Sequence, residues 1–114
     1  NELKVRLFDE VKELLSDFTK TDEYLDYLCS KIREAARFAD GEEMTIYISP
    51  SDKEKQTELE KRTGMTITIS EYDFMGGMRA VIRGRNILID HSFQAAVDYE
   101  YHQFSFAAGG AGIE

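Results

Sequence analysis

The sequence predicts an α+β fold: a two-layer α/β sandwich in which a four-stranded mixed sheet packs against helices. Three observations predict it. Apolar residues recur at helical spacing over residues 3–39, residues 44–70 have the pattern strand, helix, strand, and residues 76–93 combine a glycine turn, two short strands and a helix start. Because 114 residues supply only one core, these elements are expected to form one domain.

The first helix is expected over residues 3–18, where Leu7, Val11, Leu14 and Phe18 form one apolar stripe at three- and four-residue spacing. Nothing before it resembles an N-cap residue. The pattern fits either a longer helix that has been truncated or an ordinary frayed first helix, and the sequence leaves both open. An exposed stripe of this kind also offers a route to a homodimer of the isolated chain.

A second helix is expected over residues 22–39, with caps supplied by residues 19–22 and with Gly41 just beyond its last apolar residue. Its apolar face begins at Leu25. Cys29 lies beside that face and is interpreted as a small residue at the edge of the core, since the chain has no second cysteine for an internal disulfide.

The next segment has the pattern of a crossover unit. Residues 44–49 alternate apolar and polar side chains, as a half-buried strand does, and Pro50 stops them. Residues 51–54 have the form of a capping box for a short, charged helix that runs to about Arg62. Residues 65–70 alternate again. The two strands are therefore expected to lie parallel in one sheet, as neighbours or next but one, with a right-handed connection.

A double glycine, Gly76 and Gly77, introduces a hairpin. Glycine lets the backbone turn where a Cβ would clash, so both residues are expected to matter for folding. Residues 78–83 alternate, the chain reverses at Gly84, and residues 86–90 run back as the second strand. The hairpin is expected to complete the sheet, with one face covered by helices and the other partly solvated.

The last helix is expected to begin near Phe93, with Asp90 or Ser92 as its cap. Its aromatic residues are interpreted as packing side chains of the core and rim. Glycines crowd the segment that follows and disfavour a helix there. We divide the chain into the end of the first helix (1–20), a globular domain (21–106) and a flexible tail (107–114).

Composition excludes several classes of partner. The formal net charge is −8, with 32% charged and 42% hydrophobic residues. Binding to nucleic acid requires a basic face, so an acidic chain argues against such a partner, and it argues equally against docking on an anionic membrane. No run of apolar residues is long enough to insert into a bilayer. A single cysteine is consistent with a reducing compartment.

No motif for catalysis, a cofactor or a metal stands out. His91, His102 and Cys29 lack the spacing of zinc ligands. No glycine-rich loop follows a strand and opens a helix with a phosphate-binding lysine. The many carboxylates fall mainly on expected helix surfaces, where they favour solubility rather than acid–base catalysis. The sequence therefore predicts a non-enzymatic chain without cofactor or metal.

A basic cluster on the hairpin is the one charge feature that suggests a contact. Arg79 and Arg83 are expected on one face of a strand, with Arg85 in the adjoining turn. We call these three residues the arginine corner. They fit either a solvated hairpin paired with nearby carboxylates or a docking contact for an acidic partner surface.

Around this hairpin the sequence resembles a known family. The segment 72–78, a strand, a glycine turn and the segment 87–93 leading into a helix resemble the E subunit of the V-type and A-type ATPases. Gly76 and Gly77 match that family's glycine pair, and Asp90, Ser92 and Phe93 match its helix start, with His91 where asparagine is more usual. The resemblance extends over about residues 5–104. The aromatic last helix and the glycine-rich tail depart from the family pattern.

The resemblance implies a stator function. In that family a long N-terminal helix pairs with a helical stalk subunit of the G or H type. The globular C-terminal domain then clamps the pair to the catalytic head of A and B subunits, while ATP turnover is coupled to proton or sodium transport. This implies a non-catalytic, cytoplasmic subunit peripheral to the membrane. It also implies that the N-terminal helix (1–20) continues from a truncated stalk helix.

The predicted partner contacts are the stripe Leu7, Val11, Leu14 and Phe18 for the helical subunit and the arginine corner for the head. Two other functions stay open. One is a stalk-like regulator of a flagellar or type III export ATPase, which has a similar domain. The other is a small enzyme or ligand-binding α/β domain, which requires a pocket with convergent polar groups.

Overall fold

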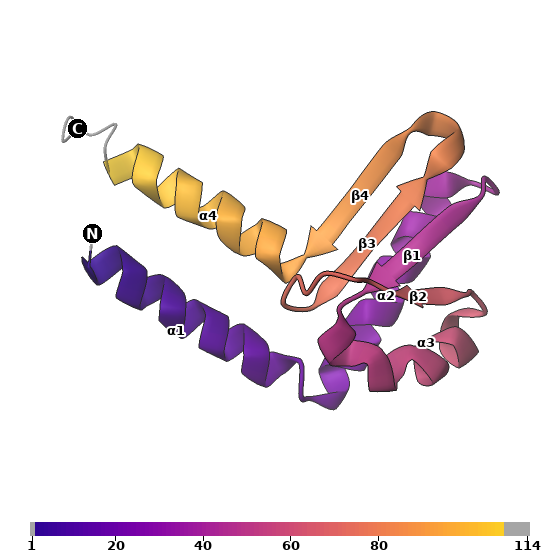
Figure 1. Ribbon diagram of the computed structural model, residues 1–114, viewed down its shortest axis with the longest axis horizontal. Coiled ribbons are helices and arrows are strands. Elements are labelled where there is room, and N and C mark those ends of the chain that lie inside the picture. The colour runs from indigo at the N-terminus through magenta and orange to yellow at the C-terminus, as the bar shows by residue number, and fades with distance from the viewer. Residues whose placement is uncertain (1, 109–114) are drawn as a thin grey trace.

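The computed structural model describes residues 2–108, with side chains to residue 104. Within this range the chain forms four α-helices and a four-stranded sheet (Figure 1). In chain order the elements are α1 (Glu2–Phe18), α2 (Asp22–Ala39), β1 (Met44–Ile48), the 3₁₀ helix η1 (Pro50–Lys55), α3 (Gln56–Thr63), β2 (Ile67–Ile69), β3 (Gly77–Ile82), the 3₁₀ turn η2 (Arg83–Arg85), β4 (Ile87–Ser92) and α4 (Phe93–Ala108).

The sheet has the order β2-β1-β3-β4 and is mixed, which confirms the predicted fold class. Strands β1 and β2 are parallel neighbours, joined through η1 and α3 as the crossover pattern predicts. Strand β3 is antiparallel to β1 and to β4, so the predicted hairpin occupies half of the sheet. In this register Ala80 of β3 lies opposite Ile46 on one side and Ile89 on the other.

One face of the sheet is buried under α2 and α3, and their side chains form a single core. Alternation along the strands directs Ile46, Met78 and Ala80 to this face, as the hydrophobic pattern predicts. The opposite face carries the other residues of each strand, and none of the described helices covers it; we call it the open face (Figure 1). The buried core cluster consists of Tyr24, Leu28, Cys29, Ile32, Ala35, Ile46, Ile48, Leu59, Ile67, Met78, Ala80 and Phe93.

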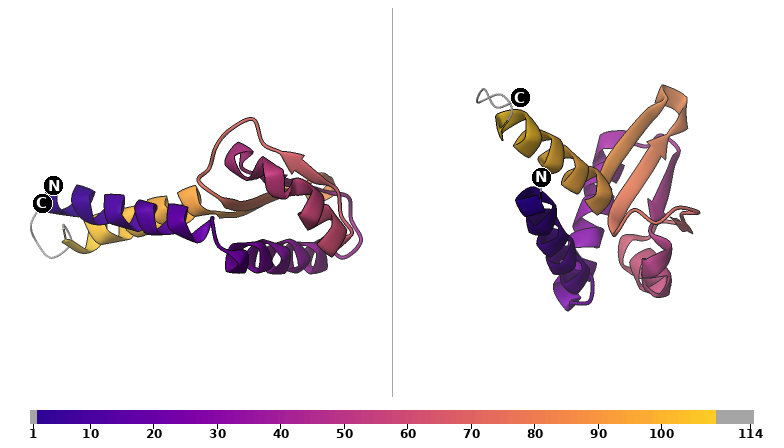
Figure 2. Two further views of the ribbon diagram at one scale, coloured as in Figure 1. Left: turned by 90° about the horizontal axis from the view of Figure 1, so that it is seen from below. Right: turned by 60° about the vertical axis from the view of Figure 1, so that its left-hand side comes forward.

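Helices α1 and α4 project together from one end of the sheet and lie side by side in an antiparallel arrangement (Figure 2). The Phe8 ring contacts the rings of Tyr101 and Phe104, with centroids 5.2 and 6.0 Å apart. Lys4 is buried in the same contact, with Nζ 3.7 Å from the Tyr101 ring centroid. The aromatic residues of the last helix therefore pack partly on the first helix, a pairing that sequence periodicity did not predict.

The predicted capping box at residues 51–54 is wrong. The segment forms the 3₁₀ helix η1, which has no side-chain cap, and α3 begins only at Gln56. The reason is that Asp52 turns inward and is almost completely buried, where it hydrogen-bonds to Tyr24 of α2. A tertiary contact has replaced the local one.

Two element ends also differ from the sequence prediction. Strand β2 covers three residues rather than the six expected, and at its start α3 satisfies the backbone: Ile67 N donates to Glu60 and Ile67 O accepts from Gln56. Helix α4 runs to Ala108, so the first two residues of the predicted tail are helical. The rest of that tail, residues 109–114, lies outside the described residues.

Candidate functional site

The glycine turn before β3 is held in a conformation that glycine favours. Gly76 and Gly77 have φ angles of +114° and +80°, a region that side chains with a Cβ rarely adopt. At Gly77 an added Cβ would collide with the carbonyl oxygen of His91 in the paired strand β4. At Gly76 it would lie 3.0 Å from both the Phe93 ring and the Tyr24 hydroxyl. Close packing on both sides thus fixes this turn against α2 and the start of α4.

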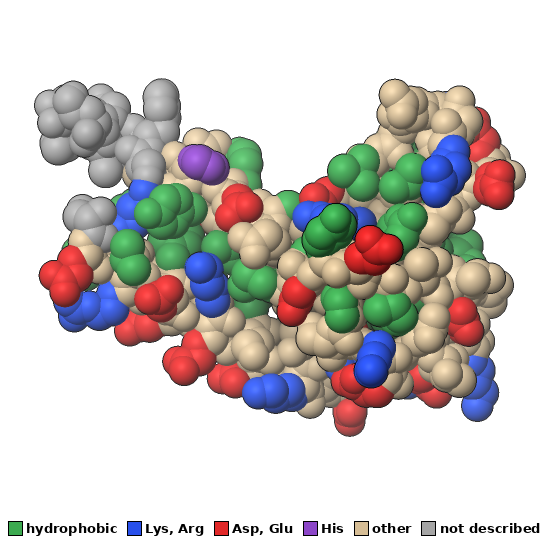
Figure 3. Space-filling model, viewed as in Figure 1, with side chains coloured by type: hydrophobic (Ala, Val, Ile, Leu, Met, Phe, Trp, Pro, Cys, Tyr) green, Lys and Arg blue, Asp and Glu red, His purple; other side chains and the backbone are tan. Residues whose placement is uncertain are grey.

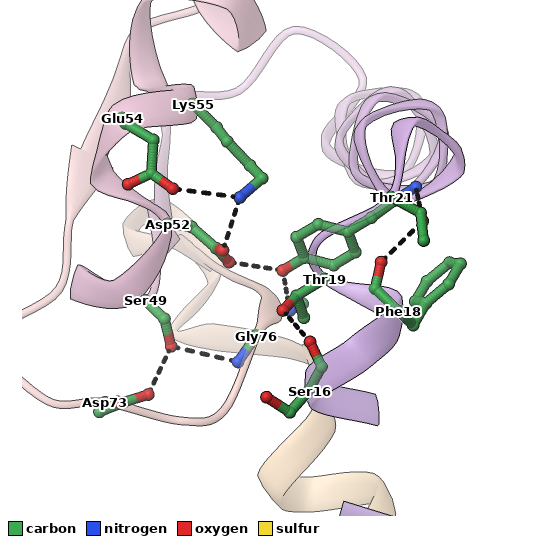
Figure 4. A network of polar contacts seen from close by, with 12 residues as sticks. Ser16, Phe18, Thr19, Thr21, Ser49, Asp52, Glu54, Lys55, Asp73 and Gly76 are labelled. Carbon is green, nitrogen blue, oxygen red and sulfur yellow. Dashed lines mark hydrogen bonds and ion pairs between the residues drawn. The ribbon is translucent and has the colours of Figure 1, made fainter. Parts of the chain in front are cut away.

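A buried polar network ties the turn to helix α2 and to η1 (Figure 4). The Tyr24 hydroxyl donates to Asp52 Oδ2 at 2.5 Å and accepts a hydrogen bond from Gly77 N at 2.8 Å. Lys55 Nζ lies 3.3 Å from the other carboxylate oxygen of Asp52. Burial raises the pKa of Asp52 above its ordinary value, although the hydrogen bond from Tyr24 and the charge of Lys55 oppose this shift.

A second set of hydrogen bonds joins the end of β1 to the same turn. Ser49 Oγ donates to Asp73 Oδ1 at 3.1 Å and accepts from the backbone nitrogens of Phe74 and Gly76 at 2.9 and 3.3 Å. Sequence analysis missed the roles of Ser49, Asp52 and Tyr24. A usable clue was present, since a hydroxyl and a carboxylate flank Pro50 at the point where a strand ends, and polar contacts often gather at the ends of strands.

The raised pKa of Asp52 predicts how stability changes with pH. The folded state holds the proton more tightly than the unfolded state, whose pKa is near the ordinary 3.8. The stability from this group is therefore fully present below that value and is lost as the pH rises through the folded-state pKa. On lowering the pH from neutrality toward 3.8, the free energy of unfolding should rise relative to that of Asp52→Asn, measured by urea unfolding at each pH. Parallel pH profiles of the two proteins would contradict this prediction.

The structure divides the arginine corner into three different environments. Arg79 lies within β3 on the open face, paired with Asp90 of β4 at 3.3 Å and stacked 4.7 Å from the Phe74 ring centroid. Arg83 does not share its strand face, as was predicted, because β3 ends at Ile82 and Arg83 begins the turn η2. The Arg83 side chain is exposed and makes no ion pair with any described residue.

Arg85 fastens the hairpin tip to the end of α2. Its Nη2 donates to the backbone oxygen of Phe38 at 3.0 Å, its Nε donates to Glu42 Oε1 at 3.0 Å, and its guanidinium stacks over the Phe38 ring. Carbonyl groups at a helix C-terminus lack partners within the helix, so a cation there is favourable. This geometry gives Arg85 a structural function.

Replacing Arg85 by alanine should therefore lower the free energy of unfolding by about 1 kcal/mol, since the contacts are strong in geometry but partly screened by solvent. Arg83→Ala, two residues away in the same turn, is the matched control and should change stability by less than about 0.5 kcal/mol. Urea unfolding of both variants checks the prediction. Equal effects of the two substitutions would show that the contact with α2 does not matter for stability.

The predicted apolar stripe of the first helix is divided between two faces. Val11 and Phe18 are half-buried, and the Phe18 ring packs edge-on against Tyr24 at a centroid distance of 5.5 Å. Leu7 and Leu14 point away from the rest of the chain, with 42% and 68% of their surface exposed. Leu3, spaced four residues before Leu7, is 70% exposed on the same flank. We call Leu3, Leu7 and Leu14 the leucine flank.

Asp90 and Ser92 shape the start of α4 together. Ser92 Oγ accepts a hydrogen bond from Ala95 N at 3.1 Å, as an N-cap residue does. Asp90 Oδ1 accepts from Ser92 N at 2.9 Å and faces Arg79. Burial raises the pKa of Asp90, but these hydrogen bonds and the Arg79 charge outweigh burial and leave the pKa below its ordinary value. Asp90 is thus held ionised beside Arg79.

The described residues favour contacts with other proteins over chemistry. Within residues 2–108 no group of three or more His, Cys, Asp or Glu side chains is arranged to hold a metal ion. None of the helices in that range is long and apolar enough to cross a membrane. The two features that stand out are the leucine flank of α1 and the open face of the sheet around Arg79.

Comparison with known proteins identifies the family. No family model matches the chain. The chain is 31% identical over 96 residues to the E subunit of the A-type ATP synthase of Saccharolobus islandicus (strain M.14.25 / Kamchatka #1), an alignment that covers 82% of this chain and 48% of the relative. It is 25% identical over 91 residues to the E subunit of the A-type ATP synthase of Pyrobaculum neutrophilum, with 80% and 48% of the two chains covered.

A bacterial relative gives the same result. The V-type ATP synthase of Clostridium tetani has a second E subunit that is 24% identical over 91 residues, covering 79% of this chain and 46% of the relative. The chain spans about half the length of the curated relatives it matches. These similarities confirm the family suggested by the glycine pair and the start of the last helix. The chain belongs to the E-subunit family of A-type and V-type ATP synthases.

Proposed function

We propose that the chain is a non-catalytic part of the peripheral stalk of a rotary ATPase of the A or V type. In this function it holds a helical stalk subunit of the G or H type to the catalytic head of A and B subunits. The stalk keeps the head still against rotor torque while ATP turnover is coupled to proton or sodium transport. We place the chain on the cytoplasmic side, at the periphery of the membrane complex.

Similarity to E subunits over 82% of the chain is the observation that carries this proposal. The arrangement of the elements supports it. A clamp needs two separate contact surfaces, and the chain exposes apolar side chains both along the projecting pair α1 and α4 and over the strands of the sheet (Figure 3). Surfaces of this kind on soluble proteins mark sites of interaction.

The leucine flank is the proposed contact for the helical stalk subunit. Leu7 and Leu14 are seven residues apart and therefore repeat at the same position of a heptad, and Leu3 extends the line by one turn. A line of leucines along one side of a helix is the pattern by which two helices pack side by side. Val11 and Phe18 are less available for this contact, because they face the rest of the chain.

Replacing Leu14 by aspartate should weaken pairing with the helical stalk subunit at least roughly tenfold, because a carboxylate would be buried in an apolar contact. Val5→Asp is the matched control. Val5 is 48% exposed and lies half a helical circumference from Leu14, so pairing should be retained. Affinity can be measured with the natural full-length chain by analytical gel filtration and biolayer interferometry.

Each outcome of this experiment has a separate meaning. Loss of pairing in Leu14→Asp alone supports the leucine flank as the contact. Pairing by both variants at the affinity of the wild type would place the helical partner elsewhere on the chain. Failure of the correctly folded wild-type chain to pair would contradict the stalk function itself. The wild type should also be run alone, because the same flank offers a homodimer contact.

A further inference from the structure

The open face of the sheet contains a hollow lined by side chains that are common at protein interfaces. Its volume is about 430 Å³, and its lining is more apolar than polar. The rim on one side is the loop at residues 70–72, and the floor consists of residues from all four strands. The floor includes Tyr47 of β1, Arg79 and Val81 of β3, and Leu88 of β4.

Exposure makes this hollow unusual for a small acidic domain. Tyr72 on the rim and Leu88 on the floor have 74% and 59% of their surface exposed. Apolar side chains are visible over the strands on this side of the molecule in Figure 3. Tyrosine and arginine are the residue types enriched among the side chains that dominate binding energy at interfaces. Here two tyrosines surround one arginine.

Arg79 occupies the centre of the open face with part of its guanidinium unused. Its Nε is buried and lies 3.3 Å from Asp90 Oδ1, in a pairing without hydrogen-bond geometry. Its Nη atoms donate no hydrogen bond to any described residue, and 32% of the side chain is exposed. Stacking on the Phe74 ring holds the guanidinium plane in place. A fork held this way is preorganised to receive a carboxylate in a bidentate contact.

We propose that the open face is the surface that docks on the catalytic head, by receiving a protein segment in which a carboxylate is flanked by apolar side chains. The carboxylate binds the outer edge of the Arg79 guanidinium, and the apolar side chains cover Leu88, Val81 and Tyr72. This inference rests on the stalk function proposed above. It assigns the head contact to the sheet face and not to the hairpin tip.

Charge and placement favour this assignment. Asp90 is already engaged by Arg79 and by the backbone of Ser92, and Glu71 stands at the rim of the hollow, so among the described residues the guanidinium is the only cation that lines it. The leucine flank lies on α1, which projects from the opposite end of the sheet from the tip of the hairpin (Figures 1 and 2). A helical partner on α1 therefore leaves the open face available to a second partner.

The test measures binding of the natural full-length chain, paired with its helical stalk subunit, to the purified head of A and B subunits by biolayer interferometry. Arg79→Gln and Leu88→Asp should each weaken binding at least roughly tenfold, and Arg79→Lys should be intermediate because it keeps the charge but loses the fork. Arg83→Gln, at the hairpin tip, is the control and should stay within about twofold. Retained pairing with the helical stalk partner and an unchanged melting temperature verify that each variant is folded.

Salt dependence separates a carboxylate contact from a purely apolar one. Binding of the wild type should weaken more steeply with added NaCl than binding of Arg79→Gln. Binding of Arg79→Gln and Leu88→Asp at wild-type affinity would overturn the inference and leave the stalk function standing. A loss confined to Arg83→Gln would move the contact to the hairpin tip, with the same consequence. Failure of the wild-type pair to bind the head at all would contradict the stalk function and this inference together.

Discussion

Replacing Gly77 by valine is expected to lower the free energy of unfolding by roughly 3–5 kcal/mol, enough to unfold much of a domain of ordinary stability. Two effects add. The φ angle of +80° is strained for any residue with a Cβ, and the new Cβ would collide with the backbone oxygen of His91 across the β3–β4 pair. Because the obstacle is backbone, the collision is relieved only by separating the strands. Thermal and urea unfolding measure the effect.

Two other glycines serve as controls for this substitution. Gly41 has a φ angle of +88° but open space around it, so Gly41→Ala isolates the cost of backbone strain, about 1 kcal/mol. At Gly84 an added Cβ would meet nothing closer than 3.6 Å, so Gly84→Ala should change stability little. A Gly77→Val chain that melts at the wild-type temperature would contradict the geometry of the turn.

Replacing Tyr24 by phenylalanine is the second substitution with a large expected effect. It removes one hydroxyl and leaves two buried groups without their partner: the Asp52 carboxylate loses a donor and Gly77 N loses its acceptor. Unsatisfied buried polar groups of this kind cost about 1–3 kcal/mol each, so stability should fall by roughly 2–4 kcal/mol. Urea unfolding at neutral pH measures the loss.

Tyr72→Phe is the matched control, because it removes the same hydroxyl from a side chain that is 74% exposed. Its effect should stay within about 0.5 kcal/mol. Combining Tyr24→Phe with Asp52→Asn tests whether the two groups act together. In that double variant the loss should be smaller than the sum of the two single losses, since the pair shares one hydrogen bond. Additive losses would mean that the buried network is not a unit.

The fold could be predicted from the sequence because its main elements carry local patterns that agree with the tertiary structure. Alternation over residues 44–49 and 78–82 set which side chains enter the core, and a one-residue change in register would have exposed them. The crossover between β1 and β2 followed from the strand, helix, strand order. These predictions needed no knowledge of distant contacts.

Features that depend on distant residues were missed for the same reason. The capping box at residues 51–54 failed because Asp52 is drawn to Tyr24, a residue 28 positions away in the chain. The pairing of α4 with α1 depends on aromatic contacts between the first and last helices, such as that of Phe8 with Tyr101. Helical periodicity gives the apolar face of each helix but not the neighbour that covers it.

The candidate contact surfaces were predicted in part. The first helix does expose leucines, but only Leu7 and Leu14 of the four predicted stripe residues are on the exposed flank. The arginine corner was assembled from strand alternation that stops at Ile82, so Arg83 was assigned to a face that it does not share. Arg85 is engaged with Phe38 and Glu42, contacts that the hairpin sequence alone does not contain.

The most direct test of the stalk function is a three-component gel filtration. The natural full-length chain, the small helical stalk subunit and the A/B head of the same organism are mixed and separated by size. The account predicts one ternary peak that contains all three, and loss of the chain from that peak with Leu14→Asp. A correctly folded chain that elutes alone, or that binds an export ATPase instead, would contradict the stalk function and favour the regulator of a flagellar or type III export system.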